Sequence, residues 1–216
     1  MGIIIPQWFY GIDSLVSVLS AVIGFAVSYN FYKLHRISKS KSHLNLHYGF
    51  ALLSMSFLII GVVSGFSYLR YLVPTPTETN VLGMFDDVVS IEDVAMWLYY
   101  IASIIAYIIF LVAYMPSDED DEFSPLLIPV WYLGYKSFHL LSMMILAYVV
   151  FRAAMNSAGK KSKASQLVLL GFSCMWLYHL LLFMTSFSGL SYVLAHITLL
   201  LGFSSFLIMI KSVSRK

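Results

Sequence analysis

Four histidines lie inside long apolar stretches of this 216-residue sequence, where few other side chains can do chemistry. Neutral imidazole is a good ligand for haem iron, zinc or copper, and it can also carry protons. His179 and His196 fall in consecutive stretches, joined by a short turn at residues 188–190. At the helical rise of 1.5 Å per residue both lie about 8–12 Å deep, and His139 lies about 15–20 Å deep from the same side. This pattern predicts a haem b or metal site formed by His139, His179 and His196, with hydrogen bonds to neighbouring helices as the alternative role of the rings.

Two further polar candidates, His47 and Lys136, also fall in apolar stretches. Because successive spans alternate in direction, we expect His47 near the membrane surface on the same side as the other histidines. Lys136 lies three residues before His139, on the same helix face. A lysine near a helix end usually extends its amine to the interface, and this is the role we expect. A proton relay or anion contact with His139 and Tyr132 or Tyr135 is the alternative.

The motifs of the common enzyme classes are missing from the sequence: it has no Gly-x-Ser-x-Gly, phosphate-binding loop, dinucleotide fingerprint or His-Glu-x-x-His. Cys174 is the single cysteine, so the chain can form neither an internal disulfide nor a cysteine-based metal site. A net charge of +2 without a dense basic stripe argues against nucleic acid as a partner. Enzymatic activity is therefore not expected.

The elements that would position these residues are membrane-spanning helices. Hydrophobic residues make up 60 % of the chain and charged residues 11 %, against about 45–50 % and about 25 % in soluble domains. A helix needs roughly 20 apolar residues to cross a bilayer, and no stretch alternates as a barrel strand would. Six stretches qualify, at approximately 9–33, 46–69, 94–114, 126–151, 167–187 and 191–210. We predict an all-α bundle of six transmembrane helices, forming a single domain over residues 1–216 in the cell membrane.

Small residues recur at helical spacing in several of these spans, which predicts close approach of the helix backbones. In the second span, Gly61 and Gly65 belong to such a stripe. Packing inside the bundle is the expected use, and a dimer contact through this pair is the alternative. Before the third span, residues 81–93 alternate apolar and acidic side chains, which predicts a short acidic amphipathic helix at the membrane interface.

The placement of charge conflicts with six alternating spans. Eleven of the thirteen basic residues fall in three clusters, at 33–41, 152–163 and 211–216. Basic loops tend to remain cytoplasmic, but three spans separate the first cluster from the second. Counting basic residues favours both termini inside. A seven-span bundle with its N-terminus outside would satisfy every cluster, but residues 71–93 would have to cross, and the acids and prolines there argue against it.

A weak repeat relates the two halves of the chain. A shift of 122 positions aligns Lys39-Ser40-Lys41 with Lys161-Ser162-Lys163, and Gly49-Phe50 with Gly171-Phe172. These matches indicate a 3+3 repeat with halves 1–115 and 116–216. In six alternating spans the halves would be inverted, as in many secondary transporters.

Three functions remain open from the sequence. Nothing in it demands more than a non-catalytic subunit of a larger membrane complex, and this is the favoured hypothesis. Its partners would be the lipid bilayer and other membrane subunits or further copies of the chain. The most specific hypothesis is an electron-transfer subunit that binds haem b or a metal through histidines. A small-solute or ion transporter or channel built from inverted three-helix repeats is the alternative.

Overall fold

The structure, a computed structural model, describes residue 9 and residues 11–72, 91–115, 134–160 and 162–214. These residues form six long α-helices and a 3-10 turn, η3 (Met184–Ser186). The helices are α1 (Ile12–Ser38), α2 (Lys41–Leu72), α3 (Ile91–Tyr114), α4 (Tyr135–Lys160), α5 (Lys163–Phe183) and α6 (Gly189–Ser214). Each of the six is long and apolar enough to cross a membrane. The predicted all-α bundle of a multi-pass membrane protein is confirmed.

Helix α4 differs most from its predicted range. It begins at Tyr135, not near residue 126, and it continues beyond residue 151 to Lys160. The predicted range followed apolarity alone, whereas the helix extends through residues 153–158, most of which favour helix without being strongly apolar. Of the predicted interfacial helix, residues 81–90 lie outside the described part of the chain, and residues 91–93 form the first turn of α3.

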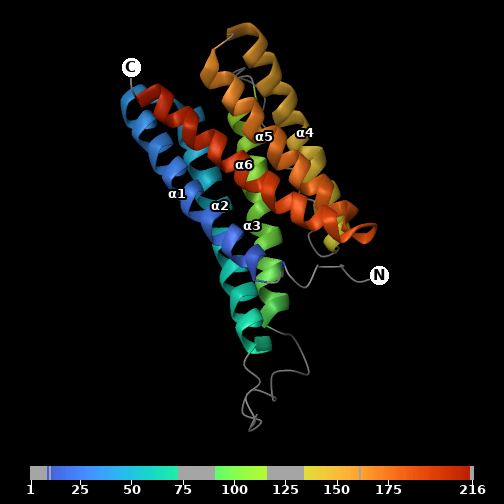
Figure 1. Ribbon diagram of the computed structural model, residues 1–216. Helices are drawn as coiled ribbons and strands as arrows, with labels where there is room; N and C mark the ends of the chain where they lie inside the picture. The colour runs from blue at the N-terminus through green and yellow to red at the C-terminus, as the bar shows by residue number, and fades with distance from the viewer. Residues whose placement is uncertain (1–8, 10, 73–90, 116–133, 161, 215–216) are drawn as a thin grey trace.

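Neighbouring helices pack side by side in a closed ring, in which each helix contacts the next along the chain and α6 returns to α1 (Figure 1). Most neighbours are antiparallel, but α3 and α4 are parallel. Tyr100 of α3 stacks on Phe138 of α4, with ring centroids 4.3 Å apart. Fourteen residues further along both helices, Arg152 Nε donates to the Tyr114 carbonyl at 3.2 Å. Met115 and Gly134, the described residues that follow α3 and precede α4, therefore lie towards opposite ends of the bundle.

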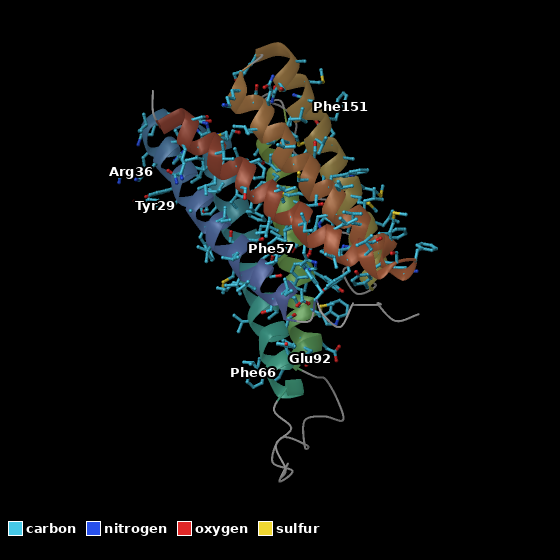
Figure 2. The ribbon with its side chains drawn as sticks, viewed as in Figure 1. Tyr29, Arg36, Phe57, Phe66, Glu92 and Phe151 are labelled. Atoms are coloured by element: carbon cyan, nitrogen blue, oxygen red, sulfur yellow. The ribbon has the colours of Figure 1, made fainter. Side chains whose placement is uncertain are left out.

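This parallel pair brings the basic clusters to one end of the bundle, which we call the basic end. It is formed by the ends of α1, α3, α4 and α6 and the starts of α2 and α5 (Figure 1). In Figure 2, Arg36 and Phe151 lie towards this end, and Phe66 and Glu92 lie towards the other. The described basic residues at or near the basic end are Lys33, Arg36, Lys39, Lys41, Arg152, Lys160, Lys163 and Lys211.

The predicted topology of six alternating spans is therefore wrong. Helix α1 begins at the end opposite the basic end, whereas α6 finishes at the basic end. Ser67 of α2 donates to Glu92 of α3 at 2.5 Å, so α2 ends where α3 begins, at the end opposite the basic end. The seven-span alternative grouped the three basic clusters on one side, as the described basic residues are grouped, but its crossing by residues 71–93 does not agree with this contact between α2 and α3.

Four phenylalanines meet at the centre of the bundle and form what we call the phenylalanine cluster. They are Phe50 of α2, Phe110 of α3, Phe172 of α5 and Phe206 of α6, and none of them is exposed. Neighbouring ring centroids lie 4.8 Å apart for Phe50–Phe110 and Phe50–Phe206, 5.3 Å for Phe110–Phe172 and 5.0 Å for Phe172–Phe206. Gly49 and Gly171 leave room for these rings, because a Cβ at either position would meet Phe110 or Phe206.

The Gly61 and Gly65 pair packs against α1 within the chain. Ser14 Oγ donates to the Gly61 carbonyl at 2.5 Å. A Cβ on Gly61 would lie 3.0 Å from Ser17 Cβ and 3.1 Å from the backbone nitrogen of Val18. The expected packing of this pair inside the bundle is confirmed, because α1 lies against it.

Replacing Gly61 with Ala is expected to destabilise the protein by about 1–2 kcal/mol, because the added methyl group pushes against the backbone of α1. Gly159 is the matched control, since nothing lies within 4 Å of a Cβ there. Gly159→Ala should be neutral or stabilising by about 0.5–1 kcal/mol through helix propensity. Unfolding in mixed detergent micelles measures both changes, and equal effects of the two substitutions would contradict the predicted α1–α2 contact.

Candidate functional site

The structure brings His139 and His179 together and leaves His196 apart. The Nδ1 atoms of His139 and His179 lie 2.8 Å apart, within hydrogen-bond distance, and the two side chains are 1 % and 0 % exposed. His196 instead donates from Nδ1 to the Tyr192 carbonyl at 2.9 Å and packs against Phe9, with ring centroids 5.6 Å apart. The three predicted ligands thus form one pair and one separate residue.

Tyr107 of α3 extends the pair to a chain of three polar groups. Its Oη lies 2.7 Å from His179 Nε2, and its side chain is fully buried. Because α3, α5 and α4 each supply one group, we call Tyr107, His179 and His139 the Tyr–His–His chain. Both ring nitrogens of His179 are engaged in it. His139 Nε2 is buried and has no hydrogen-bond partner within the described part of the protein.

The hydrogen bonds favour one arrangement of protons in this chain. If Tyr107 donates to His179 Nε2, then His179 Nδ1–H donates to His139 Nδ1, and His139 carries its proton on Nε2. Only that terminal N–H is then without a partner. If the hydrogen bonds ran the other way, the Tyr107 hydroxyl proton would have no acceptor, because this hydroxyl has no other hydrogen-bond partner among the described residues. An unpaired buried donor costs about 1–3 kcal/mol, so the first arrangement is preferred.

The Tyr–His–His chain runs partly along the axis of the bundle. His139 lies four residues after the start of α4, and His179 lies four residues before the end of α5, so the two rings are at one level. In the parallel α3–α4 pair, Tyr100 matches Phe138 and Tyr114 matches Arg152. On the same register, the backbone of Tyr107 lies about 9 Å closer to the basic end than that of His139. The chain therefore connects different depths.

The geometry of the pair does not suit a haem. Axial histidines bind opposite faces of the iron, and two metal–nitrogen bonds of about 2.0–2.1 Å separate their nitrogens by about 4 Å. The Nδ1 atoms of His139 and His179 are 2.8 Å apart and bonded directly to each other, which leaves no room for a macrocycle between them. Among the described residues, no group of three or more His, Cys, Asp or Glu is placed to hold a metal ion.

Comparison with known proteins adds no relative to these observations. No family model, no curated protein and no solved structure matches this chain.

The two remaining candidates lie outside the Tyr–His–His chain. His47 lies towards the basic end, not on the side of the other histidines as predicted, because α2 begins at that end. There its Nδ1 lies 2.8 Å from Ser28 Oγ, and this hydroxyl donates to the His47 carbonyl at 2.9 Å, so His47 joins α2 to α1. Lys136 is exposed. The neighbouring Tyr135 packs edge-on against His139, with ring centroids 4.5 Å apart; Tyr132 lies outside the described residues.

Sequence reasoning missed Tyr107, although α3 carried a signal for it. Tyrosines near the start of a span commonly lie at the membrane interface, but Tyr99 and Tyr100 are only 5 % and 6 % exposed. Together with Ser103, Tyr107 and Phe110 they recur at spacings of three and four residues, which places all five on one face of the helix. A face that combines hydroxyl groups with large rings in this way indicates a polar side turned towards the bundle interior.

Proposed function

We propose that this membrane protein transports protons, alone or together with a small solute, through the Tyr–His–His chain. The observation that supports the proposal is the unbroken hydrogen bonding from Tyr107 through His179 to His139, which ends at a buried nitrogen with no partner. Hydrogen-bonded histidines inside a membrane domain are a common feature of proton pathways in pumps and transporters. The hypotheses of an electron-transfer subunit and of a non-catalytic subunit rest on the sequence alone.

The chemistry of imidazole suits this role because one ring nitrogen can accept a proton while the other releases one. When the Nε2–H of His139 passes to an acceptor, His179 supplies a proton from its Nδ1 to His139 Nδ1. Tyr107 then supplies its hydroxyl proton to His179 Nε2 and takes one from a water molecule on the side of the basic end. Each proton moves along a hydrogen bond of 2.7–2.8 Å. One passage leaves the proton of His139 on Nδ1 and that of His179 on Nε2, so both rings must turn over before the next proton can pass.

The surroundings keep this pathway narrow. Phe138 is fully buried and packs against both histidines, with ring centroids 4.9 Å from His139 and 5.5 Å from His179. Tyr135 packs against the His139 ring on the side that faces away from the basic end. These rings exclude bulk water, so a proton would enter and leave at the two ends of the chain, at His139 and at Tyr107.

Proton flux into liposomes tests the proposal. The purified protein is reconstituted with a trapped pH-sensitive dye, and a potassium gradient with valinomycin sets the membrane potential. We expect acidification well above that of empty liposomes, and a fall of about tenfold or more for His179→Gln and for His139→Gln, consistent with the usual contribution of a positioned proton-transfer group.

His47→Gln is the matched control, because His47 is also a histidine within a span but lies outside the chain. It should keep the flux of the parent protein. Flux through the parent that does not exceed the flux of empty liposomes would contradict the proposal, and so would equal losses in all three variants.

A further inference from the structure

Helices α1 and α2 match α4 and α5 in their positions along the sequence. With a shift of 122 residues, the end of α1 at Ser38 falls on the end of α4 at Lys160, and the start of α2 at Lys41 falls on the start of α5 at Lys163. The same shift carries the buried face of α1 onto that of α4. The matched buried pairs are Val16–Phe138, Ser17–His139, Ser20–Ser142, Ala21–Met143, Gly24–Leu146, Val27–Val149 and Phe31–Ala153.

One of these pairs shares a rare property. Ser20 and Ser142 are both fully buried, and the hydroxyl groups of both lack a hydrogen-bond partner in the described part of the chain. Other serines in these helices, such as Ser17 and Ser54, donate to a backbone carbonyl one turn earlier. The same exception at matched positions points to a matched environment.

The third helix of each half also corresponds, at a different shift. Moving α3 by 96 residues places Tyr107 on Phe203 and Phe110 on Phe206. The difference between the two shifts reflects two features of the first half: α2 (Lys41–Leu72) is longer than α5 (Lys163–Phe183), and residues 73–90 between α2 and α3 outnumber residues 184–188 between α5 and α6. Because α3 and α4 are parallel, α1, α2 and α3 run in the same directions as α4, α5 and α6, and the predicted inverted arrangement of the halves is wrong.

Ring geometry inside the bundle follows the same two-fold pattern. Phe50 and Phe206 have centroids 4.8 Å apart with planes at 72°, and the corresponding pair Phe172 and Phe110 has 5.3 Å and 71°. The phenylalanine cluster therefore lies on a pseudo-two-fold axis that runs along the bundle.

The Tyr–His–His chain has a counterpart under this pseudo-symmetry. His179 and Tyr107 pack edge to face, with centroids 5.3 Å apart and planes at 89°. The corresponding residues Phe57 and Phe203 do the same, at 5.8 Å and 85°. The apolar pair occupies the matching place between the two halves without any polar side-chain atom, so the packing of the helices does not require a histidine and a tyrosine there.

We infer that the chain consists of two parallel copies of a three-helix unit, α1–α3 and α4–α6. In this arrangement the contact between Tyr107 and His179 corresponds to the contact between Phe203 and Phe57. The polar site is a modified form of that contact, and the apolar form is still present at Phe203 and Phe57. Tyr107 belongs to the first copy and His179 to the second, so the site lies between the copies, and Phe57–Phe203 is the second contact between them. His139, at the position of Ser17, completes the site at one contact only. The proposed function assigns the proton as the ligand of this site. The correspondence of the two contacts does not depend on that assignment.

Exchange of residues between the two contacts tests this inference in the full-length protein. All variants carry His139→Leu, so that no ring nitrogen loses its partner. One then adds Tyr107→Phe and His179→Phe, which copies the other contact, and the matched control adds Tyr107→Leu and His179→Leu. Both are assayed for thermal unfolding in detergent and for proton flux.

The phenylalanine variant should unfold at least about 5 °C above the leucine variant, because only phenylalanine reproduces the edge-to-face contact of Phe57 and Phe203. A phenylalanine variant that unfolds at or below the midpoint of the leucine variant, or that fails to fold when the leucine variant folds, would overturn the inference. Neither variant should conduct protons. Failure of the proposed function would appear separately, as absence of flux through the parent protein.

Discussion

Cysteines that replace Lys41 and Lys163 are expected to react from the same side of the membrane, and that side should be the cytoplasm. Both residues are exposed, and each is the first residue of a helix at the basic end. Lysine and arginine near the ends of spans are retained on the cytoplasmic side, and each would cost about 2.5–3.5 kcal/mol at the centre of the membrane. The clustering of basic residues at one end therefore predicts the orientation of the whole bundle.

A membrane-impermeant maleimide measures this in intact cells and again after lysis. The background variant carries Cys174→Ser, since Cys174 is the single cysteine of the chain. Cysteines at 41 and 163 should react only after lysis. A cysteine in place of Ser188, an exposed residue between α5 and α6 at the opposite end, should react in intact cells. If residues 41 and 163 react from opposite sides, the parallel pair of α3 and α4 is wrong and six alternating spans are correct.

The spans could be predicted from the sequence because the length of an apolar stretch is a direct physical requirement of a bilayer. The direction of a span was inferred only from the assumption that each helix reverses the one before. That assumption failed between α3 and α4, where the distribution of Lys33, Arg152 and Lys211 was the better guide. The conflict between charge and alternation in the sequence was therefore a true signal that two consecutive helices run in the same direction.

The candidate site was predicted in part. His139 and His179 were placed in one site, and they are in contact. The predicted depth of His139 was too great because it was counted from an apolar stretch that begins before α4. His196 was included because it was expected at a similar depth on the adjacent helix, but its ring packs against Tyr192 and Phe9. Residues on adjacent antiparallel helices can lie at the same depth while their side chains point in different directions. The sequence does not determine these directions.

The spacing of polar and aromatic residues in α3 could place Tyr107 on an inward face, but it could not identify Tyr107 as the partner of His179. A tyrosine on a membrane helix suits the interface as well as the interior, because its ring is apolar and its hydroxyl is polar. Only the packing of α3 against α5 shows that the Tyr107 hydroxyl reaches His179 and does not reach water. Whether two polar side chains on distant helices meet depends on how each helix is rotated about its own axis. Small and aromatic residues at the helix contacts together determine that rotation.

The largest effect on stability is expected from Phe50→Ala. Phe50 is fully buried and lies within ring contact of Phe110, Phe172 and Phe206, so its removal opens a cavity on the pseudo-two-fold axis. In a soluble protein such a change costs about 3–5 kcal/mol. In a membrane protein the unfolded helices still lie in lipid, which is as apolar as the core, so mainly the packing part of that cost remains. We expect a loss of about 2–3 kcal/mol, measured by unfolding in mixed micelles with increasing denaturing detergent.

Phe151→Ala provides the comparison because Phe151 is 59 % exposed on α4 and would face lipid (Figure 2). Its removal takes the same atoms from lipid contact and leaves no cavity, so a loss below about 1 kcal/mol is expected. Phe172→Ala, at the position that matches Phe50 in the second unit, should cost about as much as Phe50→Ala. Equal losses for Phe50→Ala and Phe151→Ala would show that the rings are not packed in the interior, and the assignment of the phenylalanine cluster as the core would fail with them.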